Sequence, residues 1–373
     1  MRPHPPLPRP PSRSSAAMRP AVLALLLATA LAPAAGAGLP VLRVSGLDYV
    51  GVEDGAALLG LRVERLVPPT AVILKDGAKP VARLVDNSRE IDLKGLRMFL
   101  GNPVAVRRGA FYVSRTDFEA RLLPRLRPDL CGPPPAPPRV IAIDPGHGGT
   151  DQGTTNPALG TMEKTYTLDV SLRLRKLLEA AGFTVVLTRD SDFDVPKPRR
   201  AEIANVAKAD LFVSVHFNSL FPNTRTTGVE VFSFPPRSQR STDSWSPGAK
   251  DDAESGESPV NRFDAWNTIL GGAMHRRVLD ALQDGDRGEK LKHLAVLRGL
   301  RCPGVLVESA FLSSDKEGAL LAKPEFRDRI AAAILAGVQD YAAEVASLQP
   351  APARAPAPGP APRAEPTRPS PGP

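Results

Sequence analysis

Hydrophobic and polar positions follow two different patterns along the chain, on either side of a Pro-rich stretch. Between Val41 and about Asp129, short apolar runs are separated by turn signals such as Asp-Gly and Asn-Pro, with one amphipathic segment at Asp54–Arg62. This spacing predicts a small α+β or mostly β module. From Arg139 to about Ala346, runs of strand length alternate with longer helical patterns. This alternation predicts an α/β domain with a central, mostly parallel or mixed sheet flanked by helices.

The second pattern is regular enough to assign its elements from the period of the apolar residues. The predicted strands are Val140–Ile143, Thr184–Thr188, Leu211–His216, Val229–Phe234, Leu294–Leu297 and Val305–Glu308. The predicted helices are Glu163–Ala181, Arg199–Lys208, Arg262–Gln283 and Pro324–Ala346. Residues 130–138 are rich in proline, which predicts a stiff, extended linker between the two domains, 41–129 and 139–346. Residues 347–373 hold almost no large apolar side chain, which predicts a disordered tail.

The beginning of the chain has the pattern of a secretory signal peptide. After Met18 and a single Arg19 comes the apolar run Ala21–Ala32, followed by the small residues of Ala35–Ala37. A run of this length is too short to span a bilayer, so we expect cleavage after Ala37 rather than a membrane anchor. Residues 1–17 then form an upstream extension, and Met18 is an alternative start. A buried N-terminal helix is the other interpretation. Secretion across the cytoplasmic membrane, most simply to the periplasm, is the location that this pattern predicts.

The charge and the cysteines exclude two other classes of protein. The formal net charge is +8, but most of it lies in residues 1–37 and in the tail, so the two domains are close to neutral. Nucleic-acid binding is therefore not expected. Cys131 and Cys302 are too few for a disulfide framework. They either pair with each other or remain as two buried thiols, and the sequence leaves both alternatives open.

Candidate chemistry begins at Val140–Gly153, where the sequence reads VIAIDPGHGGTDQG. A buried strand ends there in a polar, glycine-rich loop that contains His147. His216 follows the buried run that starts at Leu211. Sites in open α/β sheets are built beyond the carboxyl ends of the strands, so we expect both imidazoles at the same edge of the sheet.

Two glutamates complete this candidate site. Glu163 opens a predicted helix, where the helix dipole alone would favour a carboxylate. Together with His147 and His216 it forms a His₂Glu set that leaves one position open, which is typical of catalytic rather than structural zinc. Glu308 ends the predicted strand after Val307 and could exchange a proton with a metal-bound water. A glutamate that caps a neighbouring loop is the alternative for Glu308.

The remaining histidines are given other roles. His4 lies in the presequence. His275 lies within a helical stretch and is expected at the surface or in a groove. His293 precedes a predicted strand and is expected to be structural, although it could reach the cleft.

Several motifs in a fixed order make the second domain resemble a known family. They are IDPGHGGTDQG, MEKTYTL, LTRDSDFDVPKPRRAEIAN, ADLFVSVHFNS, GVEVF, DRGEKLKHLAVLR and CPGVLVESAFLSS. Together they resemble the zinc-dependent N-acetylmuramoyl-L-alanine amidases of the bacterial cell wall, over Arg139 to about Ala346. The resemblance implies Zn²⁺ as the cofactor. It also implies the residue roles that follow: zinc ligands at His147, Glu163 and His216, a catalytic Glu308, and supporting roles for Arg200 and Asn218.

The activity implied by the resemblance is hydrolysis of the amide between N-acetylmuramic acid and L-alanine. The implied partner is peptidoglycan, and no stable membrane insertion is expected after signal cleavage. A protein activator of the amidase is a further candidate partner, and the sequence leaves open whether one is needed. Two alternatives remain: a catalytically inactive peptidoglycan-binding protein and a zinc peptidase acting on stem peptides. Residues 235–261 are a polar insertion at a point where some relatives place a regulatory segment. Glu254 or Glu257 could therefore occlude the zinc, although a solvated flexible loop is the simpler expectation.

The first domain resembles the N-terminal-like module of copper amine oxidases. The resemblance rests on GLDYVGVEDGAALLGL and MFLGNPVAVRRGAFYVSRTDFEARLLPRL. It implies no copper here, because residues 41–129 contain neither histidine nor cysteine. We expect an accessory wall-binding or spacer domain, with a purely structural role as the alternative.

Overall fold

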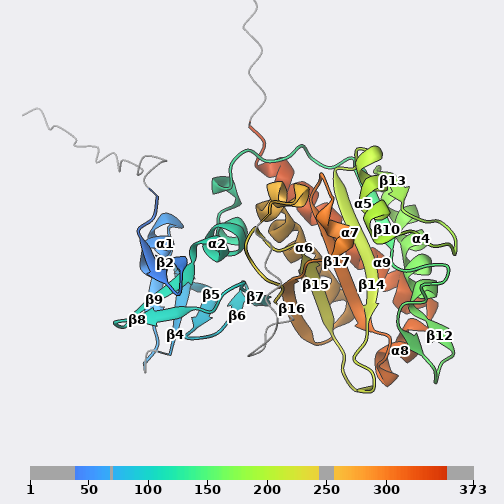
Figure 1. Ribbon diagram of the computed structural model, residues 1–373, viewed down its shortest axis with the longest axis horizontal. Helices are drawn as coiled ribbons and strands as arrows, with labels where there is room; N and C mark the ends of the chain where they lie inside the picture. Colours follow the sequence, from blue (N-terminus) through green and yellow to red (C-terminus); the bar gives the residue numbers. More distant parts are fainter. Residues whose placement is uncertain (1–37, 68–69, 243–255, 351–373) are drawn as a thin grey trace, which may run out of the picture. The chain divides into compact units, whose positions relative to one another are not determined.

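The computed structural model describes residues 38–67, 70–242 and 256–350 (Figure 1). The predicted signal peptide, almost all of the predicted tail, and Glu254 lie outside these ranges. The described residues from Leu39 on belong to one compact unit. No helix in the described ranges combines the length and the apolar character that a membrane crossing requires.

The first region, up to Leu130, is built mainly from short strands. One four-stranded sheet has the order β1 (Val41–Val44), β2 (Leu47–Gly51), β9 (Ala110–Ser114), β8 (Ala105–Arg107). An antiparallel series follows the chain through β3 (Arg62–Arg65), β4 (Ala71–Asp76), β5 (Lys79–Val85), β6 (Glu90–Leu93) and β7 (Leu96–Phe99). The helical segments are α1 (Val52–Leu58), α2 (Arg115–Asp117), η1 (Phe118–Leu122), α3 (Leu123–Leu126) and η2 (Pro128–Leu130). The short helix predicted at Asp54–Arg62 therefore lies slightly earlier, at α1.

The second region supplies six strands of an eleven-stranded mixed sheet, in the order β13-β10-β14-β17-β15-β16-β7-β6-β5-β4-β3. These strands are β10 (Val140–Pro145), β13 (Thr184–Leu187), β14 (Leu211–Asn218), β15 (Val229–Ser233), β16 (Asp286–Leu291) and β17 (Gly304–Phe311). β13, β10, β14 and β17 are parallel, whereas β15 runs antiparallel to β17. A separate antiparallel pair joins β11 (Thr155–Asn156) to β12 (Thr161–Met162). The predicted α/β fold with a mixed sheet is confirmed.

Helices cover both faces of this sheet, and the strand period decides which side chains meet them. α4 (Glu163–Ala180), α6 (Asp264–Leu282) and α9 (Pro324–Ser347) enclose the larger core, while α5 (Lys197–Val206) and α7 (Ala295–Arg298) enclose a smaller one. Shorter helices are α8 (Asp315–Leu321) and η3 (Pro259–Phe263). On β14, Val213 and Val215 belong to the larger core and Phe212 to the smaller. Successive side chains point to opposite faces, so His216 lies on the face of Phe212, which is the α5 and α7 side.

Several predicted elements differ from the observed ones. The predicted strand Leu294–Leu297 is the helix α7, and the strand β16 just before it was not predicted. β16 reads DRGEKL, and this polar segment is a strand because tertiary ion pairs stabilise its charged side chains. Lys290 pairs with Glu230 on β15, and Glu289 pairs with Arg125. β17 also continues three residues beyond Glu308, so this glutamate lies within a strand rather than at its end.

His275 is buried, and its predicted position at the surface or in a groove is wrong. Its Nε2 lies 2.7 Å from Oδ1 of Asp286, the first residue of β16. Helix α6 packs against α9 on one side and against β15, β16 and β17 on the other, so little of its circumference reaches solvent. Cys131 and Cys302 are both free thiols, and Cys302 is buried.

The large sheet and several buried contacts cross the predicted boundary between the two domains. β16 pairs in parallel with β7, with Glu289 opposite Met98. Arg125 of α3 forms a buried ion pair with Glu289, and Nη1 of Arg121 donates to Oγ1 of Thr268 on α6 at 3.0 Å. The division into 41–129 and 139–346 stays a prediction, but within the described residues the two regions share one sheet.

Candidate metal centre

The loop that carries His147 starts from a buried carboxylate at the end of β10. Asp144 is fully buried and accepts hydrogen bonds from Oγ1 of Thr188 at 2.5 Å and Oγ of Ser214 at 2.7 Å. Nη1 of Arg200 forms an ion pair with the same carboxylate at 2.8 Å. Three neighbouring segments therefore fix the point where the strand turns into the loop.

Two buried arginines hold the backbone of the loop itself. Nη2 of Arg200 donates to the carbonyl of His147, and Nη2 of Arg189 donates to the carbonyl of Gly146, both at 2.8 Å. Arg189 is only 1% exposed and also donates from Nε to the carbonyl of Pro145 at 3.0 Å. His147 has a φ of +61°, which is unusual for a residue with a side chain. These donors stabilise that conformation, and the supporting role of Arg200 implied by the resemblance stays a prediction.

Gly146 allows the loop to approach the second histidine. A Cβ on Gly146 would lie 2.4 Å from the ring of His216, which no side chain could accommodate. The glycine therefore serves close packing against His216, in addition to the turn that the sequence indicates. The rings of His147 and His216 consequently lie edge to face, with their centroids 4.9 Å apart.

Glu163, the first residue of α4, contacts both imidazoles. Its Oε1 is 2.9 Å from Nδ1 of His216, and its Oε2 is 3.1 Å from Nε2 of His147. One ligand atom from each of the three residues lies within 4.8 Å of the others. The structure thus brings together the three residues that the sequence predicted as metal ligands.

The surroundings of Glu163 also favour the ionised form of its carboxylate. Glu163 is 3% exposed, and its two oxygens accept hydrogen bonds from the backbone N–H groups of Phe217 at 3.0 Å and Thr154 at 2.9 Å. Burial alone would raise the pKa of Glu163, but the hydrogen bonds from His147 and His216 outweigh it and hold the pKa well below its usual range. Glu163 is therefore ionised, as a metal ligand must be.

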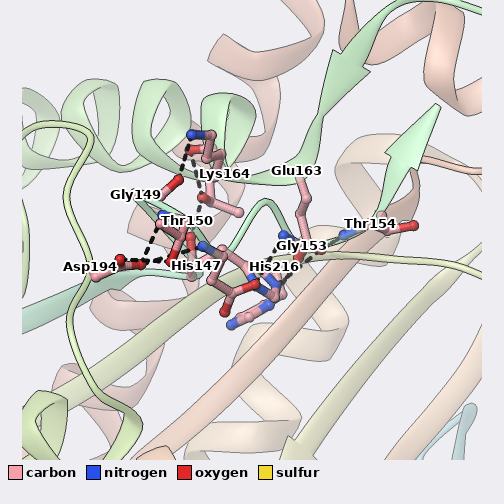
Figure 2. A network of polar contacts seen from close by, with 12 residues as sticks. His147, Gly149, Thr150, Gly153, Thr154, Glu163, Lys164, Asp194 and His216 are labelled. Atoms are coloured by element: carbon pink, nitrogen blue, oxygen red, sulfur yellow. Dashed lines mark hydrogen bonds and ion pairs between the residues drawn. The ribbon is translucent and has the colours of Figure 1, made fainter. Parts of the chain in front are cut away.

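Aspartates orient His147 and the loop behind it, and the sequence analysis did not identify them. Oδ1 of Asp151 lies 2.8 Å from Nδ1 of His147, so this carboxylate fixes the orientation of the ring. Asp194 accepts from Oγ1 of Thr150 at 2.8 Å, and Nζ of Lys164 donates to the carbonyl of Gly149 at 2.8 Å (Figure 2). The sequence signal that could have identified Asp151 is its position in the same loop, four residues after His147.

Glu308 faces the same cavity from β17. It lies opposite His216 in the parallel register and opposite Glu230 in the antiparallel one. His147, Glu163, His216 and Glu308 all line one cavity of about 540 Å³. Within the described residues, Oε2 of Glu308 is buried and has no hydrogen-bond partner. Burial and the nearby charges of Glu163 and Glu230 raise the pKa of Glu308 well above its usual value.

The other predicted site residues occupy distinct positions. Asn218 lines the cavity and donates from Nδ2 to Oε2 of Glu230 at 3.0 Å. His293 lines the cavity as well, and its Nε2 bonds to the carbonyl of Gln239 at 3.0 Å, so it is structural and also reaches the cleft. Glu257 lines a separate cavity together with Arg262 and Arg301. Glu254, the other residue predicted to occlude the zinc, lies outside the described ranges.

Comparison with known proteins identifies the family of the second region. The family model for N-acetylmuramoyl-L-alanine amidase matches residues 141–340. An uncharacterised cell wall amidase of Bacillus anthracis is 34% identical over 210 residues, which cover 54% of this chain and 35% of that protein. The amidase AmiC of Neisseria meningitidis is 31% identical over 218 residues, which cover 54% of this chain and 52% of that protein.

A solved structure is also similar to the second region. The amidase AmiC2 of Nostoc punctiforme shares 30% sequence identity over 54% of this chain and 96% of that chain, with a TM-score of 0.44. The chain thus spans about a third to a half of the length of the two curated relatives named above.

Proposed function

This chain belongs to the N-acetylmuramoyl-L-alanine amidase family through residues 141–340, and on that basis we propose that it hydrolyses peptidoglycan. The bond cleaved is the amide between N-acetylmuramic acid and L-alanine. The observation that supports this most strongly is the convergence of His147, Glu163, His216 and Glu308 on one cavity. These residues come from a loop, a helix and two strands, so their convergence is a property of the fold and not of one local motif.

The donor set fits Zn²⁺. Two imidazoles and one carboxylate, with room left for a further ligand, form the arrangement of catalytic zinc sites. His147, Glu163 and His216 would hold the ion, and Asp151 supplies the carboxylate that commonly orients a ligating histidine. When bound, Zn²⁺ polarises a substrate carbonyl and lowers the pKa of a bound water to roughly 7.

Glu308 is the proposed general base and acid. Its Oε2 is buried in the cavity and makes no hydrogen bond within the described residues, so it is available to a reacting group. Glu308 takes a proton from the attacking water and then delivers it to the nitrogen of the leaving L-alanine. Arg200 keeps the His147 loop in place, and Asn218 holds the wall beside Glu308 through Glu230.

Mass spectrometry of digested peptidoglycan tests this proposal. The full chain should release intact stem peptides and leave peptide-free glycan strands, and a chelator should stop the reaction. Shortened peptides would instead indicate a peptidase, and a bound wall without products would indicate a binding protein. Either of those results would refute the proposed amidase activity.

The variant Glu308→Gln tests the assignment of the base. It should retain zinc but lose turnover by about 10²- to 10⁴-fold, because it removes the proton acceptor while keeping the shape of the side chain. Glu202→Gln on α5 is the matched control, since Glu202 is exposed and pairs only with Arg199 among the contacts seen here. Wild-type turnover in the Glu308→Gln variant would remove Glu308 from the mechanism.

The location and partners follow from the same substrate. We propose that the protein acts outside the cytoplasmic membrane, as the predicted signal peptide and a wall substrate require. Peptidoglycan is the proposed partner, and regulation by a protein activator is a further part of the proposal.

A further inference from the structure

The segment Gln239–Thr242, called here the bridging segment, lies between the first region and one wall of the catalytic cavity. Lys292, His293, Leu294, Ala295 and Val296 form that wall, in the connection from β16 into α7. Gln239, Ser241 and Thr242 are all buried, with exposed fractions of 3%, 3% and 8%. The segment is therefore part of the protein interior rather than a solvated loop.

On the cavity side, the bridging segment holds the wall through its backbone and hydroxyl groups. The carbonyl of Gln239 accepts from Nε2 of His293 at 3.0 Å, and Oγ of Ser241 accepts from the backbone N–H of His293 at 3.1 Å. Thr242 also bonds to Leu291: its N–H donates to the Leu291 carbonyl at 2.8 Å, and its Oγ1 accepts from the Leu291 N–H at 2.9 Å. A shift of the segment would therefore move the start of the wall with it.

On the other side, the first region holds the same segment. Nε2 of Gln239 donates to Oδ1 of Asp117 at 3.0 Å, and Nη1 of Arg89 donates to the carbonyl of Thr242 at 3.4 Å. Asp117 is fully buried and also accepts from the backbone N–H of Gly101 at 2.6 Å. A Cβ on Gly101 would lie 2.5 Å from Cδ of Gln239, so the backbone there packs directly on the glutamine side chain.

We propose that the first region positions the cavity wall through the bridging segment, and that Gln239 is a positioning residue for substrate binding. The inference rests on the proposed amidase function of the cavity. The metal ligands and Glu308 lie on α4, β14, β17 and the His147 loop, and none of them bonds to the bridging segment among the contacts seen in the described ranges. Loosening of the segment should therefore weaken the binding of the peptidoglycan stem more than it slows the chemical step.

Two variants approach the contact from opposite sides. Gln239→Met removes the side-chain amide that bonds to Asp117 but keeps the length of the side chain. The backbone carbonyl of residue 239, which bonds to His293, is also kept. Gly101→Ala displaces the end of the Gln239 side chain from the first region. The matched control is Thr268→Val, which removes the hydrogen bonds of Thr268 to Arg121 and to the carbonyl of Ala120. These bonds join the same two regions but do not reach the wall.

Steady-state kinetics on soluble muropeptides is the first readout. In Gln239→Met and Gly101→Ala, KM should rise by about 3- to 10-fold, which corresponds to the loss of one hydrogen bond. The kcat of both variants should stay within about twofold of wild type. Thr268→Val should leave KM unchanged although it lowers the melting temperature. The inference is overturned if KM stays at the wild-type value in both test variants, or if Thr268→Val raises KM to the same extent.

Amide hydrogen exchange is the second readout and needs no activity. The N–H groups of Leu291 and His293 should exchange faster in Gln239→Met and Gly101→Ala than in wild type. Their exchange rates in Thr268→Val should equal those of wild type. Equal exchange in all four proteins would show that the segment does not hold the wall. If the wild-type chain released no stem peptide, the proposed function would fail, whereas the exchange rates would still decide whether the first region positions the wall.

Discussion

At the level of single residues, the candidate metal centre depends on side chains that do not themselves face the cavity. Asp144 and Arg189 do not line it, yet they fix the end of β10 and the carbonyls of the His147 loop. A preorganised site needs such support, because a ligand that is free to move pays the entropy of ordering when the ion binds. The contact of Asp151 with His147 is the most direct case.

Asp151→Ala should weaken zinc binding by about 10- to 100-fold, because the imidazole of His147 loses the carboxylate that orients it. Asp190→Ala is the control: Asp190 is exposed, and its side chain bonds only to Oγ of the adjacent Ser191 among the contacts seen here. Competition against a chelator of known affinity measures both dissociation constants. Equal constants for the two variants would show that the carboxylate does not support the ligand.

At the level of elements, tertiary contacts override local preference in the stretch from β16 to α7. A polar sequence forms the strand β16 because β15 and β7 border it and neighbouring residues pair with its charges. An apolar sequence right after it forms the short helix α7, which packs with α5 in the smaller core. Periodicity predicts a strand at Leu294–Leu297 and no element at β16, since it depends only on the order of residues and not on their neighbours in space.

The start of α6 should make stability depend on pH. Burial raises the pKa of Asp264 to about 7; the hydrogen bond from Asn261 opposes this rise, and Glu257 adds to it. The folded protein therefore holds a proton that the unfolded chain releases near pH 4. The stabilisation is complete below the unfolded pKa and is lost as pH rises through about 7, with a slope of at most about 1.4 kcal/mol per pH unit.

Asp264→Asn removes this titration while keeping an oxygen that can accept from Asn261. Urea unfolding between pH 4 and pH 8 should show a flatter pH dependence for the variant than for wild type. Identical slopes in the two proteins would mean that Asp264 is ionised throughout this range.

At the level of the whole molecule, the two regions are joined through one sheet and a buried ion pair. Arg125 and Glu289 have side-chain exposures of only 10% and 3%. Breaking a buried pair leaves an uncompensated charge, which costs far more than the loss of an exposed pair. The joint between the regions is thus specific and not merely a linker between independent units.

Arg125→Met should lower the free energy of unfolding by about 3–5 kcal/mol, because Glu289 remains buried without its partner. The double variant Arg125→Met/Glu289→Gln should recover part of that loss, since it removes the second charge. Arg127→Met serves as the control: it breaks the exposed pair with Asp129 and should cost no more than about 1 kcal/mol. Denaturant unfolding of the three variants measures their free energies of unfolding. A double variant less stable than Arg125→Met would contradict the prediction.

The sequence alone determined the elements with a strong period and the candidate site that they carry. The apolar runs before His147 and His216, and the amphipathic pattern after Glu163, predict two strands and a helix whose ends meet at one edge of a parallel sheet. Because this geometry follows from any open parallel sheet, the three side chains could be grouped before their distances were seen. Ligation of a metal by them stays a proposal.

Only the tertiary structure decided the features that depend on which segments become neighbours. The burial of His275, the strand β16, the orientation of His147 by Asp151 and the contact of Gln239 with Asp117 all join residues through the folded backbone. A charged or polar side chain has the same local pattern whether it faces solvent or a buried partner. Its role is set by the partner, and the partner is fixed only when the sheet and its helices have come together.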